Sequence, residues 1–285
     1  MARSVGSEPE ARLLGVWFEA THFSQNTPTL TPLVMMAHMT DLLLIVPHPD
    51  DEVFGCGGLF AKMAAHGKKV ATLTLTRGGA GRSLGLCLQP DLPGVRELEL
   101  RGSLDALGVE EVHVWDYPDF VPDIDRGMEH RDGLQAVPTE EIVPKIVALL
   151  DELKPKKVLT FPPNGSNGHP DHVTTHTLAM SALEKSTHTL DALYYFASDK
   201  PYDSEARQGF LPPAEIAAQH LYPTHYVDVH DYVEPKLRAM GKHKTQALSV
   251  LMFMEKLTRR LLVESFHRAA PEFLEGQGGR TVPWL

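Results

Sequence analysis

Cysteine is nearly absent from this sequence, since only Cys56 and Cys87 occur in 285 residues. Two cysteines cannot form a disulfide framework, so the chain fits a reducing compartment and we expect a cytoplasmic protein. An excess of positive charge is also missing, because 37 acidic and 27 basic residues give a formal net charge of −10. This balance argues against a nucleic-acid binder that depends on phosphate contacts. No apolar run approaches the roughly 20 residues of a membrane-spanning helix, so we expect no membrane partner.

The first 38 residues have mixed polarity and no clear periodicity, and we expect residues 1–38 to form a poorly ordered N-terminal extension. The apolar stretch at 13–18 is too short for a signal peptide and is flanked by glutamates. Methionines at 35, 36 and 39 leave open where the natural chain starts. Residues 39–285 are enough for a large core, and we predict that they form one catalytic domain that includes the C-terminal helices.

Apolar runs and amphipathic segments alternate along this domain. Runs typical of buried strands lie at 42–46, 70–76, 112–115, 158–161, 192–196 and 226–229. Helical patterns lie at 59–66, 95–107, 139–153, 173–183, 232–244 and 255–268, whereas 120–138 is read as a loop. The alternation predicts an α/β fold, Rossmann-like and doubly wound, with a mostly parallel sheet. In the common strand order 3-2-1-4-5, the first and fourth strands lie side by side.

Two polar clusters follow these two strands. The segment PHPDDE at 47–52 comes directly after the first strand, and HPDH at 169–172 follows the fourth. Ligands bind at the carboxyl ends of strands in such sheets, so we expect both clusters to open into one crevice. Taken alone, each His-Pro-Asp segment could be a plain turn, and Asp171 could simply cap the next helix.

The residue types in the two clusters favour a metal site. His48, Asp51 and His172 offer two imidazoles and a carboxylate, and they leave a coordination position open, as catalytic zinc sites require. The same set fits Fe²⁺ as well as Zn²⁺, so the sequence does not fix the metal. Such a site suits amide hydrolysis, with Asp50 as general base. His169, its ring oriented by the neighbouring aspartate of the motif, could donate to the oxyanion.

Neighbouring residues have less specific assignments. His176, one turn beyond the HPDH motif, could be a further ligand, but a packed position is favoured because three ligands suffice. Glu52 is expected to brace its loop. A dinucleotide site is disfavoured, since carboxylates in the first strand-to-helix turn would repel phosphate. The glycine-rich loop between Arg77 and Arg82 is either a plain turn or a substrate clamp.

Together, PHPDDE and HPDH resemble the LmbE-like, or PIG-L, family of zinc-dependent N-acetylglucosaminyl deacetylases. The resemblance covers about residues 40–250 and implies zinc held by His48, Asp51 and His172, with Asp50 as the base and His169 as the electrostatic catalyst. Asp171, which would orient or charge the His169 ring, completes the expected catalytic set. Further similar stretches are TRGGAG at 76–81, VRELEL at 95–100 and HKTQ at 243–246. With WDYPD at 115–119, they look like the bacillithiol-biosynthesis branch, whose substrate is N-acetylglucosaminyl malate.

That branch implies removal of the acetyl group from an N-acetylglucosamine-containing small molecule. Separately, the sequence is compatible with a homo-oligomer. Arg77, Arg82 or Arg96 would bind the malate carboxylates through paired hydrogen bonds. Asn167 would lie beside the substrate, where some relatives carry a tyrosine. The near alternatives are a diacetylchitobiose-type chitooligosaccharide deacetylase and a thiol-conjugate amidase. A phosphoesterase would need a second metal, and the alternative of another class is a non-catalytic sugar-binding protein.

Overall fold

The computed structural model describes residues 39–122, 131–202, 205–272 and 279–285. The expected N-terminal extension, residues 1–38, lies outside the described residues, as does the middle of the expected loop at 120–138.

A mostly parallel eight-stranded sheet forms the centre of the domain, in the order β10-β8-β9-β7-β6-β1-β2-β3. Its strands are β1 (Leu42–Val46), β2 (Val70–Thr76), β3 (Glu111–Tyr117), β6 (Lys157–Thr160), β7 (Ala192–Phe196), β8 (His225–Asp228), β9 (Val263–Ala270) and β10 (Arg280–Val282). Only β9 runs antiparallel to its neighbours in this sheet, whose strands all belong to the described residues. A short antiparallel pair, β4 (Phe120–Val121) and β5 (Arg131–Asp132), stands apart.

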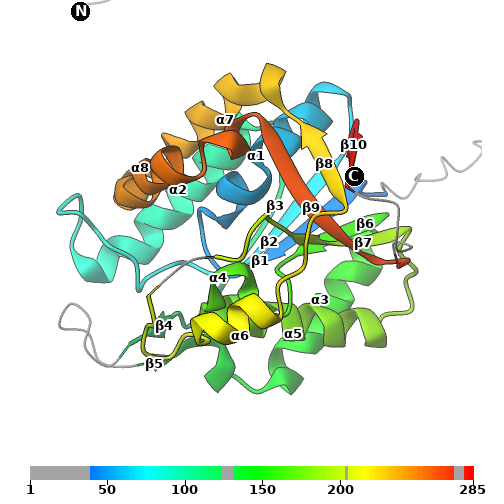
Figure 1. Cartoon of the computed structure of the whole chain (residues 1–285). Coiled ribbons are helices and arrows are strands. Elements are labelled where there is room, and N and C mark those ends of the chain that lie inside the picture. Colours follow the sequence, from blue (N-terminus) through cyan, green and yellow to red (C-terminus); the bar gives the residue numbers. More distant parts are fainter. Residues whose placement is uncertain (1–38, 123–130, 203–204, 273–278) are drawn as a thin grey trace, which may run out of the picture. The chain divides into compact units, whose positions relative to one another are not determined.

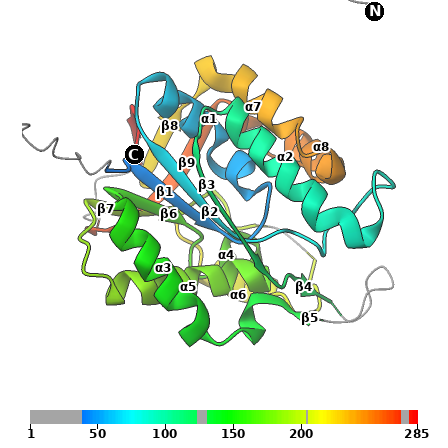
Figure 2. The ribbon, with the colours of Figure 1, turned by 180° about the vertical axis from the view of Figure 1, so that it is seen from behind.

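Helices cover both faces of the sheet (Figures 1 and 2). They are α1 (Asp51–Ala65), α2 (Leu92–Ala106), α3 (Thr139–Leu153), α4 (Gly165–Gly168), α5 (Pro170–Lys185), α6 (Pro213–Ala218), α7 (Val233–Met240) and α8 (Ala247–Lys256). Helices α1, α2 and α7 lie on one face, and α3 and α5 lie on the other. Strand β1 explains the two layers, because Leu42 and Leu44 pack in one core while Leu43 and Ile45 pack in the other.

The predicted fold class and the adjacency of the two key strands are confirmed. Strand β1 pairs in parallel with β2 on one side and with β6 on the other. The carboxyl ends of β1 and β6 therefore meet at the same edge of the sheet, which brings PHPDDE and HPDH together. None of the helices in the described ranges is long and apolar enough to span a membrane.

The helix predicted at 255–268 is wrong. Helix α8 ends at Lys256, and strand β9 occupies Val263–Ala270 between β7 and β8. Alternate residues of β9 are buried, among them Glu264, whose carboxylate forms an ion pair of 2.6 Å with Lys236 Nζ. A charged residue at an inward position interrupts the alternation of apolar and polar residues that is typical of a strand. The sequence pattern of this segment therefore did not indicate a strand.

Helix α1 begins at Asp51, eight residues before the predicted start at 59. Its glycines serve packing, because a Cβ on Gly55 would overlap the ring of Phe196. The helix is kinked at Cys56, beyond which the Glu264 carboxylate accepts hydrogen bonds from the backbone N–H groups of Gly58 and the next residue. The glycines therefore lie inside the helix.

Candidate active site

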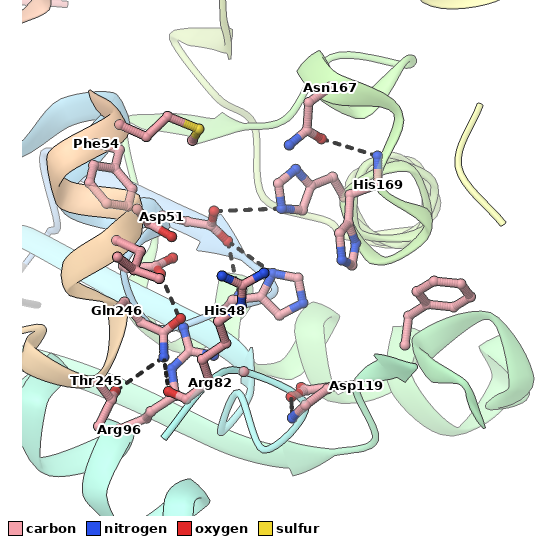
Figure 3. A pocket seen from close by; sticks show the side chains of 18 of the residues that line it. His48, Asp51, Phe54, Arg82, Arg96, Asp119, Asn167, His169, Thr245 and Gln246 are labelled. Atoms are coloured by element: carbon pink, nitrogen blue, oxygen red, sulfur yellow. Dashed lines mark hydrogen bonds and ion pairs between the residues drawn. The ribbon is translucent and has the colours of Figure 1, made fainter. Parts of the chain in front are cut away.

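The first motif forms a tight connection between β1 and α1. Thr76, at the end of β2, donates its hydroxyl to the carbonyl of Pro47 at 2.9 Å, which ties the loop to the sheet edge. The backbone N–H of His48 donates to Asp51 Oδ2 at 3.0 Å. Both side chains of this pair point toward α5 and its HPDH motif (Figure 3).

The three predicted ligands come together. His48 Nδ1 lies 3.6 Å from Asp51 Oδ2, and His172 Nε2 lies 3.6 Å from Asp51 Oδ1. The ring centroids of His48 and His172 are 5.3 Å apart. The structure thus gathers two imidazoles and one carboxylate from β1–α1 and from α5, as the two motifs predicted.

The other ring nitrogens of these histidines are already used. His48 Nε2 hydrogen-bonds with Asp171 Oδ2 at 3.1 Å, and His172 Nδ1 hydrogen-bonds with the carbonyl of Gly165 at 3.0 Å. Histidines that bind metals usually donate their second N–H to a carboxylate or a backbone carbonyl. The nitrogens left over, His48 Nδ1 and His172 Nε2, are the two that lie beside Asp51, so the donor set fits a divalent cation.

Asp171 orients the ring of His169 through its backbone and not through its carboxylate. Its N–H donates to His169 Nδ1 at 3.1 Å, whereas its Oδ2 lies 4.0 Å from that nitrogen and hydrogen-bonds with His48 Nε2 at 3.1 Å. Its carboxylate also accepts the backbone N–H groups of Phe120 and Leu134, each at 2.8 Å. Nor does Asp171 cap α5, because the ring of His169 accepts the backbone N–H of Asp171 at that helix end. The spacing of the motif does not determine which histidine the carboxylate of Asp171 contacts, because that contact depends on how the side chains are oriented.

His169 offers a proton to the site. Its Nδ1 accepts the backbone N–H of Asp171 at 3.1 Å, so a neutral ring carries its proton on Nε2. Burial and the neighbouring His48 lower the pKa of His169 well below its ordinary value, which keeps the ring neutral. One nitrogen from each of His48, His169 and His172 lies within 4.8 Å of the others. His169 therefore lies close enough to face the same reacting group.

Asp50 adopts a strained backbone conformation directly beside this group. Its φ of 105° is uncommon for a residue other than glycine. Arg96 Nη2 lies 3.2 Å from Asp50 Oδ2 and also donates to the carbonyl of Pro49. Burial raises the pKa of Asp50 to about 7, although the Arg96 charge opposes the shift. A carboxyl group with this pKa is suited to accept and return a proton near neutral pH.

A cavity of about 880 Å³ opens above these residues. It is lined by His48, Asp50, Asp51, His169 and His172, by Arg82, Arg96 and Asn167, and by residues of the loops and of α8 around them, including Asp119, Arg207, Gln246, Leu248 and Met252. Figure 3 shows Arg82, Asp119 and Gln246 on one side of the histidines and Asn167 on the other.

The predicted substrate-binding arginines occupy three different positions. Arg82 is exposed on the cavity wall. Arg96 is buried and donates to the carbonyls of Pro49 and Gly78, so it supports the loop beneath the cavity. Arg77 lies outside this cavity, in ion pairs with Glu97 at 3.0 Å and Asp116 at 3.7 Å. The glycine-rich loop is shaped around Arg96, because a Cβ on Gly78 would overlap its guanidinium.

Comparison with known proteins identifies the chain's relatives. The family model described as PIG-L, GlcNAc-PI de-N-acetylase, matches residues 43–183. A 1D-myo-inositol 2-acetamido-2-deoxy-alpha-D-glucopyranoside deacetylase of Mycobacteroides abscessus is 32% identical over 231 residues, which cover 72% of this chain and 81% of the relative. The protein of the same name from Saccharomonospora viridis is 31% identical, over 72% of this chain and 84% of its own length. The chain belongs to the PIG-L family.

Solved structures share the fold of this PIG-L protein. An N,N'-diacetylchitobiose deacetylase from Pyrococcus horikoshii has a TM-score of 0.59 at 21% identity, covering 80% of this chain and 82% of its own. A 4-carboxy-2-hydroxymuconate hydratase from Pseudomonas putida has a TM-score of 0.56 at 16% identity, covering 84% and 99%. A hydratase and a deacetylase share this architecture, so the chemistry must be argued from the site.

Sequence reasoning missed two polar residues that line the cavity of this PIG-L protein. Asp119 is 5% exposed and lines the cavity; its Oδ2 accepts the backbone N–H of Ala80 at 2.7 Å, while its Oδ1 has no hydrogen-bond partner within the described residues. Arg207 lies on the cavity wall, with its guanidinium carbon 5.2 Å from the ring centroid of Phe210. The aspartate stands in the WDYPD motif, whose position at the carboxyl end of β3 could have indicated it. The segment around Arg207 carries no such signal.

Proposed function

We propose that the protein is a metal-dependent N-deacetylase that hydrolyses the acetamido group of an N-acetylglucosamine-containing small molecule and releases acetate and a free amine. The observation that carries this proposal is the convergence of His48, Asp51 and His172 beside the carboxylate of Asp50, in one cavity. The membership of the PIG-L family and the names of the relatives support the same reaction.

The proposed ligands are His48 Nδ1, Asp51 and His172 Nε2, with Zn²⁺ as the first candidate and Fe²⁺ as the second. Three imidazoles also approach one another here, but Asp51 lies 3.6 Å from each of the two ligand histidines and adds the negative charge that a cation needs. When bound, the cation would polarise the amide carbonyl and lower the pKa of water.

The chain's own residues supply the proton transfers. Asp50 takes a proton from the attacking water and passes it to the nitrogen that leaves as the amine. His169, neutral and protonated on Nε2, donates a hydrogen bond to the oxyanion of the tetrahedral intermediate. Asp119 Oδ1, which has no hydrogen-bond partner among the residues that the structure describes, is placed to accept a hydrogen bond from a sugar hydroxyl, because a buried carboxylate oxygen requires a donor.

Two aglycones are candidates. Arg82 and Arg207 present guanidinium groups on the cavity wall without an ion-pair partner in the described part of the chain, which suits an anionic aglycone such as malate. The curated relatives are named for an inositol conjugate, which is uncharged. We therefore propose N-acetylglucosaminyl malate first and the inositol conjugate second.

An amine-release assay separates these alternatives. We expect turnover of N-acetylglucosaminyl malate with zinc present and its loss with a chelator, at a higher kcat/KM than with the inositol conjugate, diacetylchitobiose or free N-acetylglucosamine. A higher kcat/KM for the inositol conjugate would assign that substrate instead. Equal background release from all four, insensitive to the chelator, would contradict the deacetylase proposal and leave a sugar-binding protein.

Asp171→Asn is expected to weaken zinc binding by about 10- to 100-fold, the usual effect of losing a partner behind a metal ligand. Asparagine has one acceptor oxygen, whereas Asp171 accepts from His48 Nε2 and from two backbone N–H groups, so one donor would face the amide NH₂. Competition with a chromophoric chelator measures the affinity. The control is Asp119→Asn, a buried aspartate that lines the cavity without contacting a ligand histidine, and it should raise KM while leaving zinc affinity unchanged. Equal zinc affinity in Asp171→Asn and wild type would contradict this role.

A further inference from the structure

Glu52 and His243 form a buried pair below the cavity. Glu52 Oε1 lies 2.6 Å from His243 Nε2 and accepts the hydroxyl of Ser103 at 2.7 Å. The side chains of both pair members are fully buried. Within the described residues, His243 Nδ1 has no partner, so its ring makes its one hydrogen bond to Glu52.

The other oxygen of Glu52 reaches Asp50. Glu52 Oε2 accepts the backbone N–H of Asp50 at 2.8 Å. The carbonyl of Asp50 accepts the N–H groups of Val53 and Phe54 at 3.2 and 3.3 Å, and Arg96 contacts its carboxylate. The N–H, the carbonyl and one carboxylate oxygen of Asp50 are therefore held, and its backbone stays at a φ of 105°. A strained conformation persists where surrounding contacts over-determine it.

We propose that Glu52 and His243 are positioning residues for the base: they fix the backbone of Asp50 so that its carboxylate points into the cavity. This inference rests on the proposed function. A carboxylate can satisfy the Asp50 N–H with one oxygen and two donors with the other, which an amide cannot do. His243 fixes the Glu52 side chain from a segment 191 residues further along the chain.

The same segment also forms the cavity wall. Three residues after His243, Gln246 donates to the backbone carbonyl of Arg82 at 3.1 Å, and both residues line the cavity. Thr245 donates through its N–H and its hydroxyl to Glu99 of α2, at 2.9 and 2.6 Å. Glu52 therefore links the position of the base to the wall against which the substrate lies.

The structure offers a matched control for Glu52. Glu264 is also a buried carboxylate that accepts backbone N–H groups of α1, those of Gly58 and Leu59, and it pairs with a buried cation, Lys236. It does not contact Asp50. Glu52→Gln and Glu264→Gln therefore remove comparable buried carboxylates, one on α1 and one on β9 that contacts α1, and only the first change acts on the base.

We expect Glu52→Gln to lower kcat by about 10- to 100-fold, as losses of supporting hydrogen bonds at catalytic sites do, with KM within about twofold of wild type. Zinc stoichiometry should stay at the wild-type value. Glu264→Gln should lower the thermal midpoint but keep kcat per folded molecule. His243→Gln keeps a donor for Glu52 and should retain more activity than His243→Leu. Kinetics, metal analysis and thermal unfolding of all four variants are measured against wild type.

Glu52→Gln with the kcat of wild type, or with a loss matched by Glu264→Gln, would overturn the positioning role. So would a loss of zinc from Glu52→Gln, because the pair would then act on the metal ligands. A wild-type protein without any amine release would instead refute the proposed function, so the two failures are distinguishable.

Discussion

Asp50→Asn is expected to lower kcat by about 10²- to 10⁴-fold, the contribution of a positioned general base. The variant should keep its fold, since asparagine tolerates positive φ better than most residues and is nearly isosteric with aspartate. Arg96 would keep its hydrogen bonds to the carbonyls of Pro49 and Gly78. Amine release under saturating substrate measures kcat, and metal analysis should show the wild-type zinc content.

Asp231→Asn is the control for this substitution, because its side chain is 82% exposed and pairs only with His230 in the described structure. It should leave kcat, zinc content and stability unchanged. If Asp50→Asn kept kcat within about tenfold of wild type, Asp50 would not be the base. A sugar-binding protein predicts the same ligand affinity for both variants and no amine release from either.

The sheet could be predicted because its signal is local. Its central strands β1, β2 and β7 are runs of residues buried on both faces of the sheet, and helices with one apolar side alternate with the strands. Adjacency of β1 and β6 then followed from the usual topology of such sheets. The prediction failed at β9, because Glu264 faces inward there and its charge is balanced by an ion pair with Lys236, which belongs to another element. The apolar–polar alternation of a strand is interrupted by such a buried charge, and the strand cannot be recognised from the sequence unless the partner of that charge is known.

The convergence of His48, Asp51 and His172 could be predicted for a similar reason, since these residues stand in short motifs at the ends of two adjacent strands. The contacts that hold these side chains in place could not be predicted. The contact of Asp171 with His48 depends on the orientation of a ring, and the pairing of Glu52 with His243 joins segments 191 residues apart. Motif spacing gives the residue types of a site, whereas hydrogen bonds between distant segments give each residue its role.

His172→Gln is expected to abolish zinc binding at stoichiometric metal and, with it, amine release. Glutamine keeps a polar side chain of similar length but lacks the imidazole nitrogen that lies 3.6 Å from Asp51 Oδ1. The loss of zinc affinity should exceed the roughly 10- to 100-fold effect of removing an outer partner such as Asp171. Chelator competition gives the affinity, and the same preparation gives the activity at saturating zinc.

His176→Gln is the matched control, because it lies on the same helix one turn further along. Its Nδ1 hydrogen-bonds with the carbonyl of Phe161 at 2.9 Å, and its ring packs against Tyr195, away from the ligand cluster. Zinc affinity and kcat should therefore match wild type in this variant. Loss of zinc from His176→Gln but not from His172→Gln would indicate that His176, rather than His172, binds the metal. That result would refute the proposed ligand set. Retained zinc in both would leave His48 and His169 as the imidazole ligands, and the carboxylate of Asp51 would then have to be tested with Asp51→Asn.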